Sequence, residues 1–500
     1  MSATAGVRNL PPRAGAMIEA LRGLGYSVEA ALADIIDNSI SAHATEVHID
    51  FAWAESQSRI SILDNGDGMT DAELERAMQL GARSPLDPRA PSDLGRFGMG
   101  LKTASFSHCR RLTVATVKEG IPGCLRWDLD ELAMSTEGGW LIFEGPSPGS
   151  EAYIGRLAGQ TKGTLVLWET LDRIVTPGFT SGDFSDLIDR VIGHLAMVFH
   201  RLLDGRCPRL KICLNGEAIE PWDPFMVGHP AKPWASPVAR KLTAAGPVEV
   251  ECHVLPHKDK LSESELKEAA GPAGWTSQQG FYVYRNERLL VAGGWLGLGQ
   301  RRAWNREEAH KLARIRLDMT NAADAEWKID IRKATARPPV SLRPWLTKLA
   351  EETRERARKV FISRGAPISR SGNRPIEQVW RADHVKSGVK YRIDEHHPAV
   401  AAVLESSGDH SALVKAMLRI IEETVPVQRI WLDTAEGKET SKASFASEPT
   451  EKVVEVLQTL FYDFVGRRGM TDEAARRTLL TMDPFQNYPD LIRNLASVSS

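Results

Sequence analysis

The stretch Asp64-Asn65-Gly66-Asp67-Gly68-Met69 decides how this sequence folds. The residues before it, Arg59-Ile60-Ser61-Ile62-Leu63, alternate in polarity and predict a β-strand that ends in a tight turn. Glycines two residues apart let the backbone approach a flat ligand, because they have no Cβ to collide with it. An aspartate at the mouth of such a turn can accept a hydrogen bond from an exocyclic amine such as that of adenine. By itself, a stretch of this kind is more often an ordinary turn or a fragment that resembles a calcium-binding loop.

The bulk composition is that of a globular protein with several domains. The chain has 500 residues, 42% hydrophobic and 26% charged, which predicts more than one hydrophobic core. A net charge of −2 means that contact with nucleic acid would need a local basic patch. Five scattered cysteines without a C-x-x-C motif favour reduced thiols over disulfides or zinc. With neither a signal-peptide pattern nor a long apolar run, we expect a cytoplasmic protein without a membrane span.

A helical pattern begins after Ser27, a good N-cap, and continues to Ile40 with apolar residues three or four apart. Asp34 and Asn38 lie four residues apart and therefore share one face of this predicted helix. A carboxylate and an amide placed in this way could hold a water molecule and a metal-bound phosphate. An isolated pair of this kind is more often the solvated polar edge of a helix.

A glycine-rich segment follows further along the chain. Residues 81–95 are rich in Gly, Pro, Ser and Asp and predict a long functional loop. They end in Gly95-Arg96-Phe97-Gly98-Met99-Gly100-Leu101-Lys102, which runs into a helical pattern and offers backbone N–H groups to phosphate oxygens. A Walker motif is absent from the sequence, and these glycines lack the strand context of a Rossmann fingerprint. Lys162-Gly163-Thr164 then leads into another predicted strand.

The order of these four motifs resembles the Bergerat-type ATP-binding fold of the GHKL superfamily. This superfamily includes gyrase-type topoisomerases, heat-shock chaperones, histidine kinases, MutL and the MORC ATPases. The Asp37–Val47 stretch looks like the MutL pattern, and Gly100-Leu101-Lys102-Thr103-Ala104-Ser105 is similar to MORC proteins. The resemblance implies an α+β chain: a Bergerat-type α/β sandwich, a transducer-like α/β domain and a mostly helical C-terminal region.

The resemblance also implies roles for the residues that match the motifs. Asp34 matches the general base that activates the attacking water, a position where the family usually has glutamate, and Asn38 matches the magnesium ligand. Asp64 matches the residue that reads adenine. The remaining nucleotide contacts implied are Gly66, Gly68 and Met69 at the base, Thr164 through water to Asp64, and Gly95, Phe97, Gly98, Met99, Gly100, Leu101 and Lys102 at the phosphates. Residues 81–97 match the ATP lid.

The segment after the ATP-binding motifs resembles the transducer domain of MORC, MutL and gyrase-type proteins. It has a predicted hairpin over residues 279–291 and further strands at 313–318 and 327–331. Transducers supply a lysine that reaches the γ-phosphate, and a compact ammonium on a long side chain suits that task. The resemblance implies Lys333 for this role, with Lys328 as the second choice.

We therefore predict four segments. Residues 1–205 form the ATP-binding domain with an N-terminal arm, 206–361 the transducer-like domain, 362–374 a linker, and 375–500 a helical domain of unknown role. Basic residues in the helix at 341–361 and in the linker could contact DNA phosphates. The acidic residues interspersed in that helix favour a solvated helix face instead.

The family resemblance implies an ATP-gated switch that uses ATP and Mg²⁺ and hydrolyses ATP slowly. Two protomers would clamp together on binding ATP, as a homodimer, through residues 1–16. The expected output is on DNA, on a partner nuclease or on another DNA-processing protein, as in anti-phage defence systems. A heat-shock-type molecular chaperone remains an alternative. So does a non-hydrolysing ATP-binding scaffold, because Asp34 is one methylene shorter than the usual glutamate.

Overall fold

The computed structural model describes most of the chain and divides it into two compact units, residues 1–364 and 365–500. The first unit contains both the predicted ATP-binding segment and the predicted transducer-like segment. The described residues are 13–23, 25–82, 100–134, 140–205, 208–324, 326–329, 335–362, 378–385, 388–427, 430, 451–482, 485 and 488–496. Within these ranges, no helix is both long enough and apolar enough to cross a membrane.

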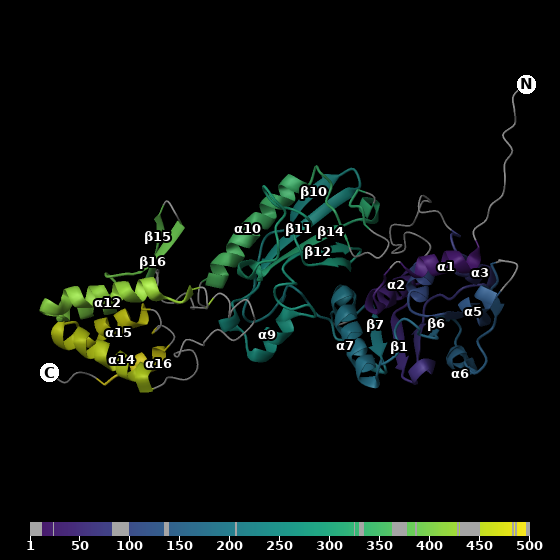
Figure 1. Ribbon diagram of the computed structural model, residues 1–500, viewed down its shortest axis with the longest axis horizontal. Coiled ribbons are helices and arrows are strands. Elements are labelled where there is room, and N and C mark those ends of the chain that lie inside the picture. Colours follow the sequence, from purple (N-terminus) through teal and green to yellow (C-terminus); the bar gives the residue numbers. More distant parts are fainter. Residues whose placement is uncertain are drawn as a thin grey trace, which may run out of the picture. The chain divides into compact units, whose positions relative to one another are not determined.

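The first unit begins with an eight-stranded sheet in the order β5-β4-β3-β6-β2-β1-β7-β8 (Figure 1). Its described strand pairs are antiparallel except β1 and β7, which run parallel. The strands are β1 (Glu46–Ala52), β2 (Arg59–Asp64), β3 (Arg111–Lys118), β4 (Ile121–Asp128), β5 (Phe143–Glu144), β6 (Gly163–Glu169), β7 (Lys211–Leu214) and β8 (Glu217–Ala218).

Helices pack on the face of this sheet to which β1 directs its apolar side chains. In β1, Val47, Ile49 and Phe51 are buried, whereas the residues between them are only partly covered. The buried face shares one hydrophobic core with Leu32 and Ile36 of α2. The helices of this part are α1 (Ala14–Arg22), α2 (Val28–Ser41), α3 (Asp71–Met78), α4 (Gly100–Phe106), α5 (Leu129–Met134), α6 (Glu151–Ile154), α7 (Ser181–Val198) and α8 (His200–Leu203).

A second sheet follows in the order β10-β11-β14-β12-β13, with β9 paired to β11. Its strands are β9 (Trp234–Ala235), β10 (Ala239–Thr243), β11 (Gly246–Val254), β12 (Gly280–Arg285), β13 (Arg288–Ala292) and β14 (Ala313–Met319). Helices α9 (Glu263–Ala270) and α10 (Arg343–Ile362) belong to this part. The strand predicted at 327–331 is wrong at its start, because Trp327 and Lys328 lie in a turn and Lys328 has a φ of 49°.

Helices α7 and α8 join the two sheets of the first unit. Helix α7 contacts both α2 and β13. Met197, at the end of α7, shares a buried cluster with Tyr284 and Leu289 of the second sheet. The Nε2 atom of His200 lies 2.7 Å from the hydroxyl of Tyr284, and both side chains are buried. This contact places β12 and β13 at a defined position relative to the first sheet.

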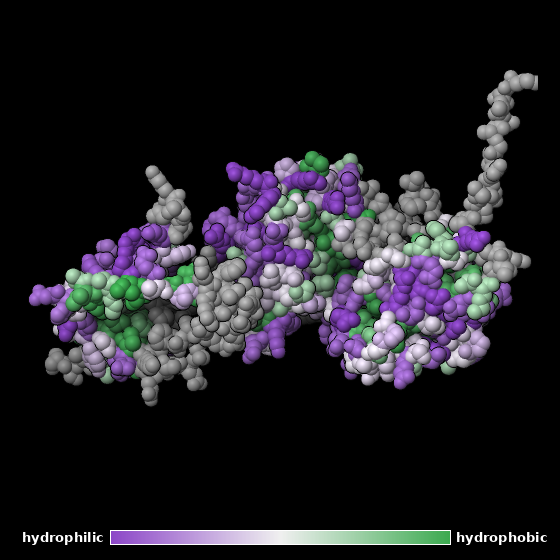
Figure 2. Space-filling model, viewed as in Figure 1, coloured by the Kyte–Doolittle hydropathy of each residue, from purple (hydrophilic) through white to green (hydrophobic). Residues whose placement is uncertain are grey.

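The second unit is mostly helical, as predicted, but it also holds a two-stranded hairpin that we did not predict. The hairpin pairs β15 (Trp380–Val385) with β16 (Gly388–Ile393). The helices are α11 (Pro398–Ser406), α12 (Ser411–Thr424), α14 (Glu451–Tyr462), α15 (Asp472–Leu480) and α16 (Pro489–Arg493). Figure 2 shows hydrophobic residues over α12, where Leu413, Met417 and Ile420 are exposed.

Candidate nucleotide-binding site

Asp64 lies at the end of β2 and is only 7% exposed. Its Oδ2 atom accepts a hydrogen bond of 2.7 Å from the Ser39 hydroxyl, and its Oδ1 atom accepts one of 2.9 Å from the backbone N–H of Gly66. Burial raises the pKa of the Asp64 carboxyl, and these two hydrogen bonds oppose that rise. The structure thus holds a buried acceptor in one orientation, as recognition of a polar ligand group requires.

The turn after β2 needs both of its glycines for packing. Gly68 has a φ of +68°, and a Cβ built there would lie 1.9 Å from the carbonyl oxygen of Val117. A Cβ at Gly66 would lie 2.8 Å from the carbonyl oxygen of Ala42, at the end of α2. The turn is therefore fitted between β3 and α2. That the same glycines also form the floor of a base pocket stays a prediction.

Thr116 of β3 connects the residues around Asp64, and the sequence analysis missed it. Its hydroxyl oxygen accepts a hydrogen bond of 2.9 Å from the backbone N–H of Met69 and donates one of 3.0 Å to the carbonyl oxygen of Gly163. The same oxygen lies 3.3 Å from the hydroxyl oxygen of Thr164, whose strand partners are Asp64 and Thr116. The structure therefore places Met69, Gly163 and Thr164 around one threonine hydroxyl, and Asp64 lies opposite Thr164 on the neighbouring strand.

Asp34 and Asn38 both lie on α2, as their spacing predicted. The carboxylate of Asp34 is buried and accepts a hydrogen bond of 3.1 Å from the Tyr26 hydroxyl. The side-chain nitrogen of the exposed Asn38 donates to the backbone carbonyl oxygen of Asp34 at 3.0 Å. Since the amide nitrogen faces the helix, the amide oxygen is the atom that can face a cation. One neutral oxygen beside phosphates and water fits the coordination that Mg²⁺ usually takes in proteins.

Arg288 of β13 reaches from the second sheet to the carboxylates of α2. Its Nη2 atom lies 3.6 Å from Oδ1 of Asp34, and its Nε atom lies 3.2 Å from the carboxylate of Asp37. All three side chains are 5% exposed or less. The sequence analysis assigned no role to Arg288 or Asp37, because nothing in the local pattern indicates a contact across 251 positions of the chain.

Helix α4 begins at Gly100, and a Cβ built there would lie 4.0 Å from Oδ2 of Asp34. The half-buried Leu101 packs against the core of the first sheet. Lys102 is buried, and its ammonium donates a hydrogen bond of 2.7 Å to the carbonyl oxygen of Ala77, in the last turn of α3. Burial lowers the pKa of Lys102 to about 8. The other predicted phosphate contacts, Gly95, Phe97, Gly98 and Met99, lie outside the described residues, as does Lys333.

Comparison with known proteins agrees with this arrangement. Residues 26–164 match the family described as histidine kinase-, DNA gyrase B- and HSP90-like ATPases. The chain contains a GHKL-type ATPase domain. The matched range begins at Tyr26, which contacts Asp34, and ends at Thr164, which pairs with Asp64. The predicted superfamily and the α+β fold class are therefore confirmed.

Two curated MORC ATPases resemble part of this chain. The ATPase morc-1 of Caenorhabditis elegans is 33% identical over 91 residues, which are 18% of this chain and 10% of that protein. The ATPase MORC2B of Mus musculus is 33% identical over 101 residues, which are 19% of this chain and 10% of that protein. The likeness supports a MORC-like ATPase, and it spans about a tenth of the length of either relative.

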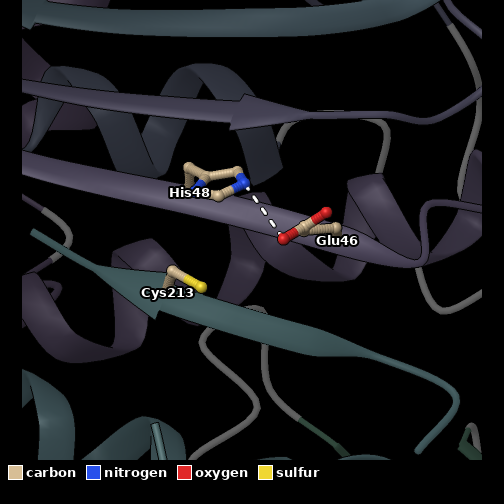
Figure 3. Close-up of side chains that lie close together, drawn as sticks. All are labelled: Glu46, His48 and Cys213. Atoms are coloured by element: carbon tan, nitrogen blue, oxygen red, sulfur yellow. Dashed lines mark ion pairs between the residues drawn. The ribbon is translucent and has the colours of Figure 1, made fainter. Parts of the chain in front are cut away.

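A second cluster of possible metal ligands lies on the sheet face of the ATPase domain opposite α2. Figure 3 shows Glu46 and His48 of β1 beside Cys213 of β7, with ligand atoms all within 4.8 Å of one another. Ligand atoms of one zinc ion lie roughly 3.5 Å from one another, so the ligand atoms of these three residues would have to move closer together to bind it. The ammonium of Lys211 already lies 3.0 Å from Glu46, which in turn lies 3.3 Å from His48. As described, the cluster is an ion-pair network, and we assign no metal to it.

Proposed function

We propose that this chain binds ATP together with Mg²⁺ and hydrolyses ATP slowly. The observation that carries the proposal is the 2.7 Å hydrogen bond between Ser39 of α2 and Asp64 of β2. Through this contact, one helix supplies Asp34 and Asn38 and also orients the buried carboxylate of Asp64. The match of residues 26–164 to a family of ATPases supports the assignment of that carboxylate to adenine.

Each residue of the site has a separate role in the proposed reaction. Asp64 accepts a hydrogen bond from the exocyclic amine of adenine, and the hydroxyl of Thr164 holds a bridging water. Asn38 is the protein ligand of Mg²⁺, which when bound supplies positive charge to the phosphate oxygens. Asp34 takes a proton from the attacking water onto its carboxylate as general base. Because aspartate is one methylene shorter than glutamate, we expect slow turnover.

At the level of the whole protein, we propose a switch that ATP closes. Lys333 would contact the γ-phosphate, and two protomers would clamp together through residues 1–16. We propose that the closed switch acts on duplex DNA, or on a nuclease or other DNA-processing partner of a defence system. Likeness to MORC ATPases supports this proposal. It is tested by measuring the molar mass with ATP and with ADP, and by adding duplex DNA to turnover assays at low and moderate salt.

Turnover is tested by comparing phosphate release from the wild type and from Asp34→Asn. Removing a general base is expected to slow kcat about 100-fold or more, while the affinity for ATP changes less than about threefold. Asn38→Ala is expected to weaken the dependence of phosphate release on Mg²⁺. Asp186→Asn, at an exposed position of α7, is the matched control and should leave both quantities unchanged.

A second candidate function is a scaffold that binds ATP without hydrolysing it. The short and buried side chain of Asp34 favours it, because its carboxylate reaches a bound water less easily than the glutamate usual at this position. Phosphate release by the wild type that equals the background, together with measurable ATP binding, would establish the scaffold and exclude the ATPase.

A further inference from the structure

Arg288 stands out among the buried charged groups because it joins the two sheets at the site of the proposed chemistry. It is the first residue of β13. From there its guanidinium contacts Asp34 at 3.6 Å and Asp37 at 3.2 Å, both on α2. A planar guanidinium can contact two carboxylates at once, which a lysine ammonium cannot do with the same geometry.

The remaining groups around Arg288 hold it in place without competing for the carboxylates. Its Nη1 atom donates a hydrogen bond of 2.7 Å to the carbonyl oxygen of Leu289, and its Cζ atom lies 5.9 Å from the ring centre of Phe199. Burial, followed by the positive charge of Arg288, lowers the pKa of His194 to about 4. His194 is therefore neutral near pH 7, whereas Arg288 brings positive charge to the two carboxylates.

The position of Arg288 depends on the second sheet. Leu289, the next residue, packs in the buried cluster that contains Met197 and Tyr284. Tyr284 is in turn held by the contact with His200. A displacement of β13 relative to α2 would therefore move the guanidinium away from Asp34 and leave two buried carboxylates close to each other. Such a pair would lose the cation that compensates its charge in the docked arrangement.

We propose that Arg288 is a positioning residue that orients Asp34 through its joint contact with Asp37, so that hydrolysis depends on the docking of the second sheet against α2. This inference rests on the proposed role of Asp34 in hydrolysis. It adds that the transducer-like sheet controls the water-activating carboxylate directly, through an arginine outside the matched ATPase segment. Nucleotide binding, which uses Asp64, should be largely independent of the contact.

The test is to measure kcat and ATP affinity for Arg288→Gln and Arg288→Lys in the full chain. Misplacement of a reacting group slows catalysis by about 10- to 100-fold, so we expect a loss of this size in kcat for Arg288→Gln. Its affinity for ATP should change less than about threefold. The kcat of Arg288→Lys should lie between that of Arg288→Gln and that of the wild type. The control is Arg240→Gln, which removes an arginine from an exposed ion pair on the same sheet and should change neither quantity.

A double variant separates positioning from a general loss of structure. Adding Asp37→Asn to Arg288→Gln removes one of the two carboxylates that Arg288 contacts in the wild type, so kcat should recover partly. If Arg288→Gln does not fold, Arg288→Lys with and without Asp37→Asn makes the same comparison. Wild-type kcat in Arg288→Gln, faster turnover, or a parallel loss of ATP affinity would overturn the inference while the proposed ATPase stands. A wild type that binds ATP without turnover would overturn both proposals.

Discussion

Replacing Gly68 by alanine tests whether the turn after β2 is held in shape by its contact with β3. The added Cβ would lie 1.9 Å from the carbonyl oxygen of Val117, at a φ of +68°. Gly120 is the matched control, because its φ is +78° and a Cβ there would meet nothing within 4 Å. Both substitutions carry the left-handed backbone penalty of about 1–2 kcal/mol, and only Gly68→Ala adds an overlap that costs about 1–3 kcal/mol more.

The free energy of unfolding should therefore fall by about 1–2 kcal/mol in Gly120→Ala and by about 2–5 kcal/mol in Gly68→Ala. Denaturant unfolding of the full chain, followed by tryptophan fluorescence to which the buried Trp127 and Trp168 contribute, measures this difference. The affinity for an ATP analogue should fall only in Gly68→Ala, because relieving the overlap shifts the turn that follows Asp64. Equal losses of stability in the two variants would refute the reasoning.

Two further predictions concern buried charges. Lys102→Met should change ATP affinity less than about twofold, since the ammonium of Lys102 donates a hydrogen bond to the carbonyl oxygen of Ala77. The pKa of Lys102 is about 8 in the folded protein and 10.5 ordinarily, so the unfolded chain holds the proton more strongly. The wild type should therefore gain stability relative to this variant as pH rises from 8 to 10.5, which urea unfolding can measure. Asp64→Asn should abolish adenine recognition in a binding assay, and a loss of less than about threefold would count against the pocket. Because burial raises the folded pKa of Asp64, the wild type should gain stability relative to Asp64→Asn as pH falls through that pKa towards the ordinary value, and the opposite trend in urea unfolding would contradict this cause.

Local patterns were enough to predict the elements that carry the proposed site. The apolar spacing after Ser27 predicts α2, and the alternation before Asp64 predicts β2, because these patterns depend on neighbours within a few residues. The helical period also places Asp34 and Asn38 on one face. The same local reasoning was wrong at Trp327, whose burial in the second core has overridden the alternating strand pattern.

Contacts between distant segments could not be predicted from local sequence patterns. Thr116 reads as one more residue of a strand, and its link to Met69 and Gly163 exists only because β3 pairs with β6 in one register. Lys102 as a phosphate contact stays a prediction, and the hydrogen bond from its ammonium to the carbonyl oxygen of Ala77 in α3 could not be inferred from the sequence. The hairpin β15–β16 was missed although its second strand carries a local signal, since Val389, Tyr391 and Ile393 alternate with Lys390 and Arg392.

The sequence by itself determined which polar groups are available: an aspartate at a glycine turn, an acid and an amide one helical turn apart, and a glycine-rich stretch before α4, all of which are encoded within short windows. Only the tertiary structure decided how these groups are held. Asp64 is buried under Ser39, and Asp34 is paired with an arginine from another sheet. Such contacts depend on strand register and on the docking of α7 and α8, which no local periodicity specifies.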